Sequence, residues 1–153
     1  MRVDAMLCNH AEAVNNLLYV SGGGVNVSSF PMGMPQPYPV AVALAIQITV
    51  PWTQTNQQHK VNVEIVGEDG ESIKIANPAG VEEPFTLEMA FNVGRPAGLQ
   101  PGDEQSIALA ANLASIPLPA AGKYEFVINV DGNPERRLPL RLQPVQGGQL
   151  NYG

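Results

Sequence analysis

The sequence predicts an all-β protein, built as a single β-sandwich of about nine mostly antiparallel strands with immunoglobulin-like or jelly-roll connections. Three observations lead to this fold class. Apolar and polar residues alternate along much of the chain, as they do in half-buried strands. The 15 glycines and 14 prolines are spread over 153 residues, which favours many turns. No long segment has the periodicity of an amphipathic helix.

The first expected strands lie in the amino-terminal third. Residues 3–7 alternate, residues 9–13 are expected to form a turn, and Asn15-Asn16 suit a left-handed turn into a strand at 17–20. Residues 40–50 differ, because alanines at 41, 43 and 45 replace the polar side. This pattern predicts a central strand that is partly covered on both faces and that another element approaches closely.

Further strands are expected at 61–65, 73–75, 85–91, 107–113, 124–130 and 138–142, separated by turns such as the one at Asp131-Gly132-Asn133. The segment FPMGMPQPYP, residues 30–39, has four prolines and is expected to be an irregular loop. The predicted domain organisation is therefore a β-sandwich at 1–142, followed by a glycine- and glutamine-rich tail at 143–153.

Composition and charge argue against nucleic acid as a partner and in favour of protein. Only 14% of the residues are charged, and the net charge is −6. Nine acidic and two basic residues lie between 61 and 104, whereas Arg136, Arg137 and Arg141 form a small basic group near the end. Nucleic-acid binding is not expected, because it depends on clustered Lys and Arg. Patches of opposite sign on one molecule favour self-association or a protein partner.

The chain is expected to be cytoplasmic and not to bind a membrane. Its amino terminus lacks the pattern of a signal peptide, and no run of about 18 apolar residues occurs. Cys8 is the only cysteine, so neither an internal disulfide nor a cysteine-based zinc site is expected. Because it ends an alternating apolar strand, Cys8 is predicted to be a small buried hydrophobic residue.

Three blocks of the sequence are similar to a known family. In chain order they are VDAMLCNHAEAVNNLLYVSGGG, LAIQITVPWTQTNQQHKVNVEIVGEDG and VGRPAGLQPGDEQSIALAANLASIPLPAAGKYEFVINVDG. They resemble a bacterial family of small domains of unknown function, over nearly the whole chain to about Leu142. The resemblance implies a compact cytoplasmic β-sandwich and supplies no catalytic residues and no activity.

Several motifs that often carry chemistry are incomplete here. The glycine run at 22–24 lacks the lysine and the following helix of a phosphate-binding loop, so it is predicted to form a bend or a crossing between sheets. His10 and His59 lack the neighbouring ligands of a jelly-roll metal enzyme and are expected at surface or turn positions. Acid pairs at 68–69, 82–83 and 103–104 leave a calcium site as a minor alternative. No catalytic residue, cofactor or metal is predicted.

The leading hypothesis is a non-catalytic protein that acts through protein–protein contacts, as an accessory subunit or a homo-oligomer. Adaptable apolar side chains and the pre-extended proline segment favour such contacts. The candidate interaction surface comprises Phe30, Met32, Met34, Pro35, Tyr38, Trp52, Arg95 and Tyr152. Arg95 is also expected to pair with a carboxylate and fix its loop. The alternatives are a small-ligand or carbohydrate-binding module near Trp52 and, less favoured, a metal-dependent enzyme using His10 or His59.

Overall fold

The computed structural model describes residues 1–146, and its regular structure there is β apart from one short 3-10 helix, η1 (Trp52–Gln54). The strands are β1 (Arg2–Val14), β2 (Leu17–Gly23), β3 (Val27–Pro31), β4 (Tyr38–Pro51), β5 (Gln58–Val66), β6 (Lys74–Ala76), β7 (Glu82–Pro84), β8 (Thr86–Asn92), β9 (Glu104–Leu118), β10 (Gly122–Val130) and β11 (Asn133–Val145). The all-β prediction is confirmed.

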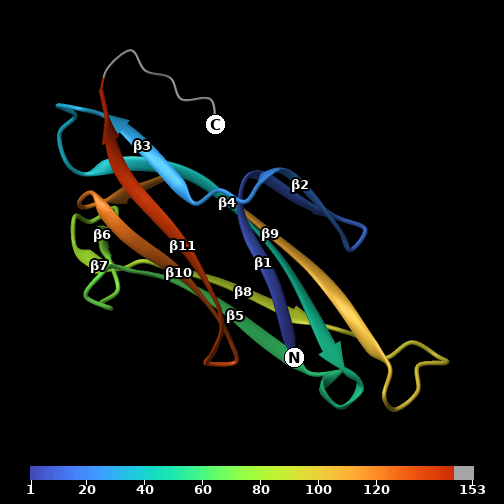
Figure 1. The fold of residues 1–153 in the computed structure, drawn as a ribbon. Helices are drawn as coiled ribbons and strands as arrows, with labels where there is room; N and C mark the ends of the chain where they lie inside the picture. Colours follow the sequence, from blue (N-terminus) through green and yellow to red (C-terminus); the bar gives the residue numbers. More distant parts are fainter. Residues whose placement is uncertain (147–153) are drawn as a thin grey trace.

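Nine of these strands form two large sheets (Figure 1). One sheet has the order β2-β1-β4-β9, the other has the order β3-β11-β10-β5-β8, and β6 pairs with β7 in a small ribbon. All neighbours are antiparallel except β3 and β11, which run parallel. The prediction of mostly antiparallel strands is therefore also confirmed.

One hydrophobic core contains side chains from both large sheets. Its fully buried members include Leu44, Ile46 and Ile48 of β4, Val63 and Ile65 of β5, and Phe126 and Ile128 of β10. These residues occupy alternate positions in their strands, as expected for the inward face of a sheet. Burial of this apolar surface is the main favourable contribution to folding.

The β1–β2 hairpin covers the outer face of β4. Ala43 and Ala45 alternate with the core residues of β4 and therefore point away from the core, yet they are only 0% and 1% exposed. They form a second cluster with Cys8 and Ala11 of β1, against which Leu18 of β2 also packs. The alanine pattern thus correctly predicted a strand that is covered on both sides by a closely approaching element.

Two asparagine side chains hold this hairpin to β9. Asn112 of β9 accepts a hydrogen bond from the backbone N–H of Ala11 at 3.0 Å and donates one to the Ala11 carbonyl at 2.8 Å. At the hairpin turn, Asn16 donates to the Ser106 carbonyl at 2.7 Å and accepts from the Ala108 N–H at 2.9 Å. Each side-chain amide binds one backbone N–H group and one backbone carbonyl, which fixes the hairpin across the sheet.

The phenol of Tyr124 closes the connection between β9 and β10. Its hydroxyl donates a hydrogen bond to the Ala120 carbonyl and accepts one from the Ala120 N–H at 3.2 Å. The side chain is buried, and this burial raises the pKa of Tyr124. The chain is therefore fixed just before it enters β10, a central strand of its sheet.

Replacing Tyr124 by phenylalanine is expected to lower the free energy of unfolding by about 1 kcal/mol, because both hydrogen bonds are lost while the ring remains buried. Urea unfolding would measure this loss. The control is Tyr19→Phe, since Tyr19 is 55% exposed and its hydroxyl makes no hydrogen bond among the described residues. Equal stability of the two variants would contradict a role for the Tyr124 hydroxyl.

Some sequence-based expectations differ from the structure. The described residues contain eleven strands rather than about nine; β3 and β7 are the strands that the sequence pattern did not define. Residues 9–13 are not a turn but continue β1, because they pair with β2 and bind Asn112. β11 extends to Val145, three residues into the predicted tail, where it pairs with β3. The remainder of that tail, from residue 147, lies outside the described residues.

The glycine run carries the chain from one large sheet to the other. Gly22 and Gly24 have positive φ angles of 63° and 88°, a region that favours glycine. A Cβ atom at Gly22 would lie against the Asn9 side chain. The N–H groups of Gly24 and Val25 both donate to the Leu7 carbonyl, and the chain then enters β3 of the five-stranded sheet. The predicted crossing between sheets is confirmed.

Candidate functional site

The structure does not bring the predicted interaction residues together. Five of them, Phe30, Met32, Met34, Pro35 and Tyr38, lie in or beside the loop between β3 and β4. Trp52 and Arg95 lie beyond the other end of β4, a strand of 14 residues, which at about 3.3 Å per residue spans more than 40 Å. Tyr152 lies outside the described residues. The candidate surface therefore divides into two separate regions.

Within the proline-rich loop, only part of the predicted surface is accessible. Phe30 is 7% exposed and belongs to the core, so its assignment to the surface is wrong. Its ring stacks on that of Tyr38, with a centroid distance of 3.7 Å. Met34 is half-buried against the core, whereas Met32 is 62% exposed and Pro35 is exposed. The stacked rings anchor the loop, and Met32 and Pro35 face solvent.

Arg95 fixes its loop through Trp52 rather than through a carboxylate. Its guanidinium carbon lies 3.8 Å from the centroid of the Trp52 ring. Nε donates to the Thr55 hydroxyl at 2.8 Å, and a terminal nitrogen donates to the Trp52 carbonyl at 3.0 Å. The predicted carboxylate partner is therefore wrong, although the loop-fixing role fits. The guanidinium covers one face of the indole, so that face is not available for stacking on a sugar.

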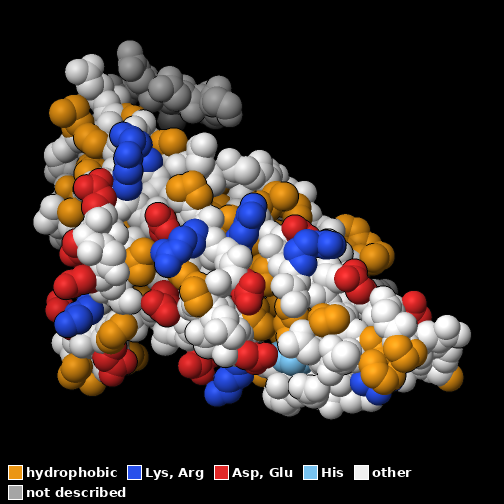
Figure 2. All heavy atoms as spheres, turned by 60° about the horizontal axis from the view of Figure 1, so that its bottom comes forward, with side chains coloured by type: hydrophobic (Ala, Val, Ile, Leu, Met, Phe, Trp, Pro, Cys, Tyr) orange, Lys and Arg blue, Asp and Glu red, His pale blue; other side chains and the backbone are white. Residues whose placement is uncertain are grey.

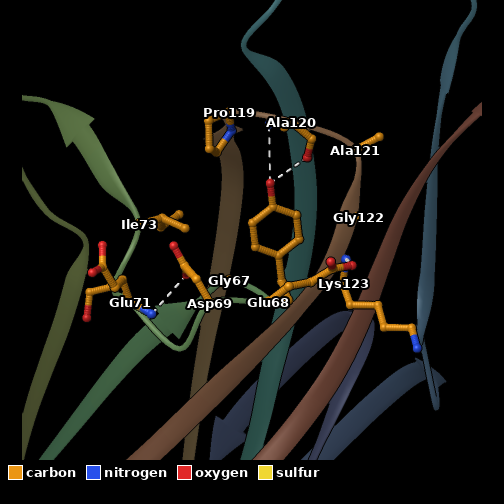
Figure 3. Close-up of a pocket in the computed structure, with 12 residues that line it drawn as sticks. Gly67, Glu68, Asp69, Glu71, Ile73, Pro119, Ala120, Ala121, Gly122 and Lys123 are labelled. Atoms are coloured by element: carbon orange, nitrogen blue, oxygen red, sulfur yellow. Dashed lines mark hydrogen bonds between the residues drawn. The ribbon is translucent and has the colours of Figure 1, made fainter.

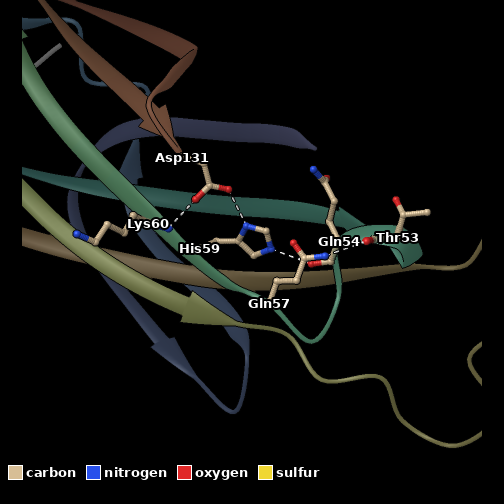
Figure 4. A network of polar contacts seen from close by, with 6 residues as sticks. All are labelled: Thr53, Gln54, Gln57, His59, Lys60 and Asp131. Atoms are coloured by element: carbon tan, nitrogen blue, oxygen red, sulfur yellow. Dashed lines mark hydrogen bonds and ion pairs between the residues drawn. The ribbon is translucent and has the colours of Figure 1, made fainter.

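His59 is the centre of a buried polar network (Figure 4). It is 3% exposed and stacks on Phe91, so its predicted surface position is wrong. Nδ1 lies 2.7 Å from the Asp131 carboxylate, and Nε2 lies 2.7 Å from the Gln54 carbonyl. Asp131 also accepts a hydrogen bond from the Lys60 N–H at 2.9 Å. Both ring nitrogens face oxygen atoms, a carboxylate and a carbonyl, and this geometry favours a doubly protonated imidazolium.

The network shifts the pKa values of both members of the ion pair. Burial lowers the pKa of His59, but the hydrogen bonds to the Gln54 carbonyl and to Asp131 outweigh it and place the pKa above the usual 6.5. Burial raises the pKa of Asp131, but the Lys60 N–H and His59 outweigh it and place the pKa below the usual 3.8. With both ring nitrogens occupied, His59 ties β5 to the β10–β11 turn.

Stability is therefore expected to fall as the solution becomes alkaline. Because folding raises the pKa of His59, its stabilising contribution is complete below 6.5 and is lost as the pH rises through the folded value. The contribution of Asp131 is lost only as the pH falls through its lowered pKa. Urea unfolding from about pH 5 to about pH 9 would show the decline. The variant His59→Gln should lack this decline, and an equal slope in both proteins would contradict the assignment.

An open hollow of about 400 Å³ lies between the β5–β6 loop and the start of β10 (Figure 3). Three acidic residues line it, Glu68, Asp69 and Glu71, and the carboxylates of the first two hold the loops. Glu68 accepts a hydrogen bond from the Lys123 N–H at 3.0 Å, and Asp69 accepts one from the Glu71 N–H at 3.0 Å. Among residues 1–146, no group of three or more His, Cys, Asp or Glu side chains is placed to hold a metal ion. The calcium alternative therefore gains no support.

The remaining motif residues have structural partners. Cys8 is fully buried, as predicted, and burial raises the pKa of its thiol. His10 is exposed, as predicted, and its Nε2 lies 3.0 Å from a Glu12 carboxylate oxygen. Residues 22–24 line a hollow of about 680 Å³ together with Asn9, Ser29 and Gln143, and neither Lys nor Arg is among its lining residues. No described residue that lines this hollow supplies a cation that could bind phosphate.

Charged side chains are interspersed on the face shown in Figure 2. Acidic and basic groups alternate across it rather than forming two large patches of opposite sign. Arg137, from the predicted basic group, lies 3.3 Å from Glu125 within the same molecule. The two side chains are largely exposed, so this pair contributes little to stability. The predicted attraction between separate acidic and basic patches is therefore weakened by pairing within the chain.

A second set of exposed side chains is both uncharged and apolar, and only one of its members, Met32, was predicted as an interaction residue. Residues 13–59 contain no Asp, Glu, Lys or Arg. Six of the eight large apolar side chains exposed among the described residues lie in this stretch, namely Val14, Leu17, Tyr19, Val20, Val27 and Met32. We call these six residues the uncharged surface. The absence of charged residues between 13 and 59 can be read from the sequence. Which of the apolar residues face solvent depends on how the chain folds, above all on the β1–β2 hairpin.

Comparisons with known proteins assign no activity to the chain. No helix in the described part of the chain is long and apolar enough to cross a membrane. No curated protein matches the sequence. The model of a family of unknown function, DUF6941, matches residues 3–143. Because this match covers nearly all of the sequence, the chain belongs to the DUF6941 family.

Proposed function

We propose that the chain is a non-catalytic protein-contact module, an accessory subunit or a homo-oligomer, and that it makes its contacts through the uncharged surface. The observation that carries the proposal is the concentration of exposed apolar side chains in a stretch of 47 residues, 13–59, that contains no Asp, Glu, Lys or Arg. Four of the six residues lie on the β1–β2 hairpin, and Val27 and Met32 lie in and just after β3. Exposed apolar groups on a folded protein can mark sites of protein interaction. Leu17, Tyr19 and Met32 are the most exposed members, at 60%, 55% and 62%.

The proposed scaffold is a β-sandwich with immunoglobulin-like connections. The strands of an immunoglobulin fold are lettered A to G along the chain, with A, B and E in one sheet and C, F and G in the other. In the four-stranded sheet, the places of A, B and E are taken by β1, β4 and β9. In the five-stranded sheet, the places of C, F and G are taken by β5, β10 and β11. Tyr124 supports this assignment, because a tyrosine near the start of strand F characteristically bonds back to the preceding backbone. Such scaffolds use loops and outer strands for recognition, which is where the uncharged surface lies.

A cytoplasmic location is part of the same proposal. The only cysteine, Cys8, is a buried free thiol, and the core is built without a disulfide. This cysteine usage is typical of proteins in reducing compartments. A carbohydrate-binding role at Trp52 is less favoured, since Arg95 covers one face of its ring.

Site-specific photo-cross-linking tests the contact role. A benzoylphenylalanine would replace Leu17, Met32 or, as the control, Val81, which is 57% exposed but lies outside the uncharged stretch. In cells that make the protein, cross-linked protein products are expected from positions 17 and 32 and not from position 81. Products of equal yield at all three positions, or products at position 81 alone, would contradict the proposal.

A further inference from the structure

We propose that β2 pairs with β2 of a second copy, forming a two-fold symmetric dimer through an antiparallel ladder at residues 17–21. The inference rests on the proposed function, because it specifies the partner and the geometry of the contact. β2 is an end strand of its sheet and has a neighbour, β1, on one side only. The backbone groups of an unpaired strand edge are a template for another strand.

Among the four end strands of the two large sheets, β2 lacks the features that normally block such pairing. β8 carries Glu88, and β3 contains Pro31. On β9, the Asn16 side chain occupies backbone groups of residues 106 and 108. In contrast, β2 has the sequence LLYVSGG, without charge or proline. Within residues 1–146, β2 is therefore the end strand of the large sheets that carries neither a charged side chain nor a proline and whose open edge no side chain is seen to bind.

The register of the hairpin shows which backbone groups of β2 are free. Asn15 and Asn16 have φ angles of 51° and 58°, as in a two-residue turn, and Val14 pairs with Leu17 across it. In a two-residue hairpin the two residues of this closing pair are hydrogen-bonded to each other. Along the ladder, hydrogen-bonded pairs then alternate with pairs that are not hydrogen-bonded to each other. The N–H and C=O groups of Leu18 and Val20 consequently point away from β1, toward the open edge.

This arrangement favours one register for the second copy. With the two-fold axis at Tyr19, Leu18 of each copy exchanges hydrogen bonds with Val20 of the other, and the two Tyr19 side chains lie directly opposite. An axis at Val20 would instead pair Leu18 with Gly22, whose positive φ of 63° interrupts the strand. A two-fold contact is also closed, so it produces a dimer and not a fibre.

Electrostatics favour a second copy at this edge over contacts elsewhere. Each chain carries a net charge of −6, and residues 61–104 hold nine acidic but only two basic groups. Two copies that met through that segment would place like charges close together. Pairing through residues 17–21 brings no charged side chain opposite another, while Leu17 and Tyr19 lose exposed apolar surface.

Sedimentation velocity over a concentration series tests this dimer. The wild-type protein is expected to change from monomer to dimer, and Tyr19→Lys should weaken the dimer by about tenfold or more, because two lysines would face each other. The matched control is Val81→Lys, which adds the same charge at an equally exposed apolar site and should leave the dimer unchanged. Tyr19 lies opposite Glu12 within the hairpin, so the added lysine is compatible with the fold.

Cross-linking gives a second readout that does not depend on a charge change. Tyr19→Cys treated with a short bismaleimide should form a covalent dimer, whereas Val81→Cys should not, and the buried Cys8 should not react. A wild-type protein that stays monomeric at every concentration, or a Tyr19→Lys variant that dimerises normally, would overturn the inference. If the chain is monomeric but positions 17 and 32 cross-link to another protein, the dimer fails while the proposed contact role stands.

Discussion

Replacing His59 by alanine is expected to lower the free energy of unfolding by about 3 kcal/mol. The side chain is 3% exposed, so its removal leaves a cavity beside Phe91. The substitution also removes the hydrogen bonds to the Gln54 carbonyl and to Asp131. Denaturant unfolding at about pH 6, where the imidazolium is present, would show the largest loss.

A matched histidine distinguishes this network from a general effect of losing an imidazole. His10 also lies 3.0 Å from a carboxylate, that of Glu12, but its side chain and that of its partner are 54% and 60% exposed. The substitution His10→Ala should therefore change stability by less than about 0.5 kcal/mol. Losses of similar size at the two positions would contradict the structural role assigned to His59.

The substitution Ala43→Leu is expected to destabilise the protein by about 2 kcal/mol and to loosen the β1–β2 hairpin. Ala43 is 0% exposed because the hairpin lies on it, so a larger side chain has no space between the hairpin and β4. Urea unfolding would measure the stability, and faster proteolysis within residues 8–20 would report the loosened hairpin.

The same strand provides the control for this prediction. Ala41 is exposed, although it is only two residues from Ala43. The pairing of β4 with β9 shifts register between Val40 and Val42, which places Ala41 at the irregularity. Ala41→Leu should therefore be tolerated with a change of less than about 0.5 kcal/mol. Equal damage from both substitutions would show that the hairpin does not cover β4 as described.

Local patterns predicted much of the fold because they reflect the immediate surroundings of each residue. The alanines of β4 indicated a second covered face, and Asn15-Asn16 indicated the hairpin turn, with φ angles of 51° and 58° in the structure. The strand at residues 9–13 was missed, because its pairing with β2 and its hydrogen bonds to Asn112 arise from tertiary structure. No local signal in the polar sequence NHAEA indicates such a partner.

The candidate site was predicted less well, since its contacts join distant parts of the chain. His59 and Asp131 are 72 residues apart in sequence, and nothing near either residue identifies the other. Arg95 was expected to find a carboxylate and instead stacks on Trp52, 43 residues earlier. Met32 and Pro35 are exposed as predicted, whereas the burial of Phe30 follows from its stacking on Tyr38 and its place in the core.

Residue-resolved amide hydrogen exchange, compared between a dilute and a concentrated sample, tests the proposed contact surface most directly. The amides of Leu18 and Val20 point toward the open edge of β2, so they should exchange rapidly in the dilute sample and become protected in the concentrated one. The amide of Tyr19, which pairs with Glu12 of β1, should be protected in both. Protection that instead increases within residues 61–104, with Leu18 and Val20 unchanged, would contradict contact through the uncharged surface.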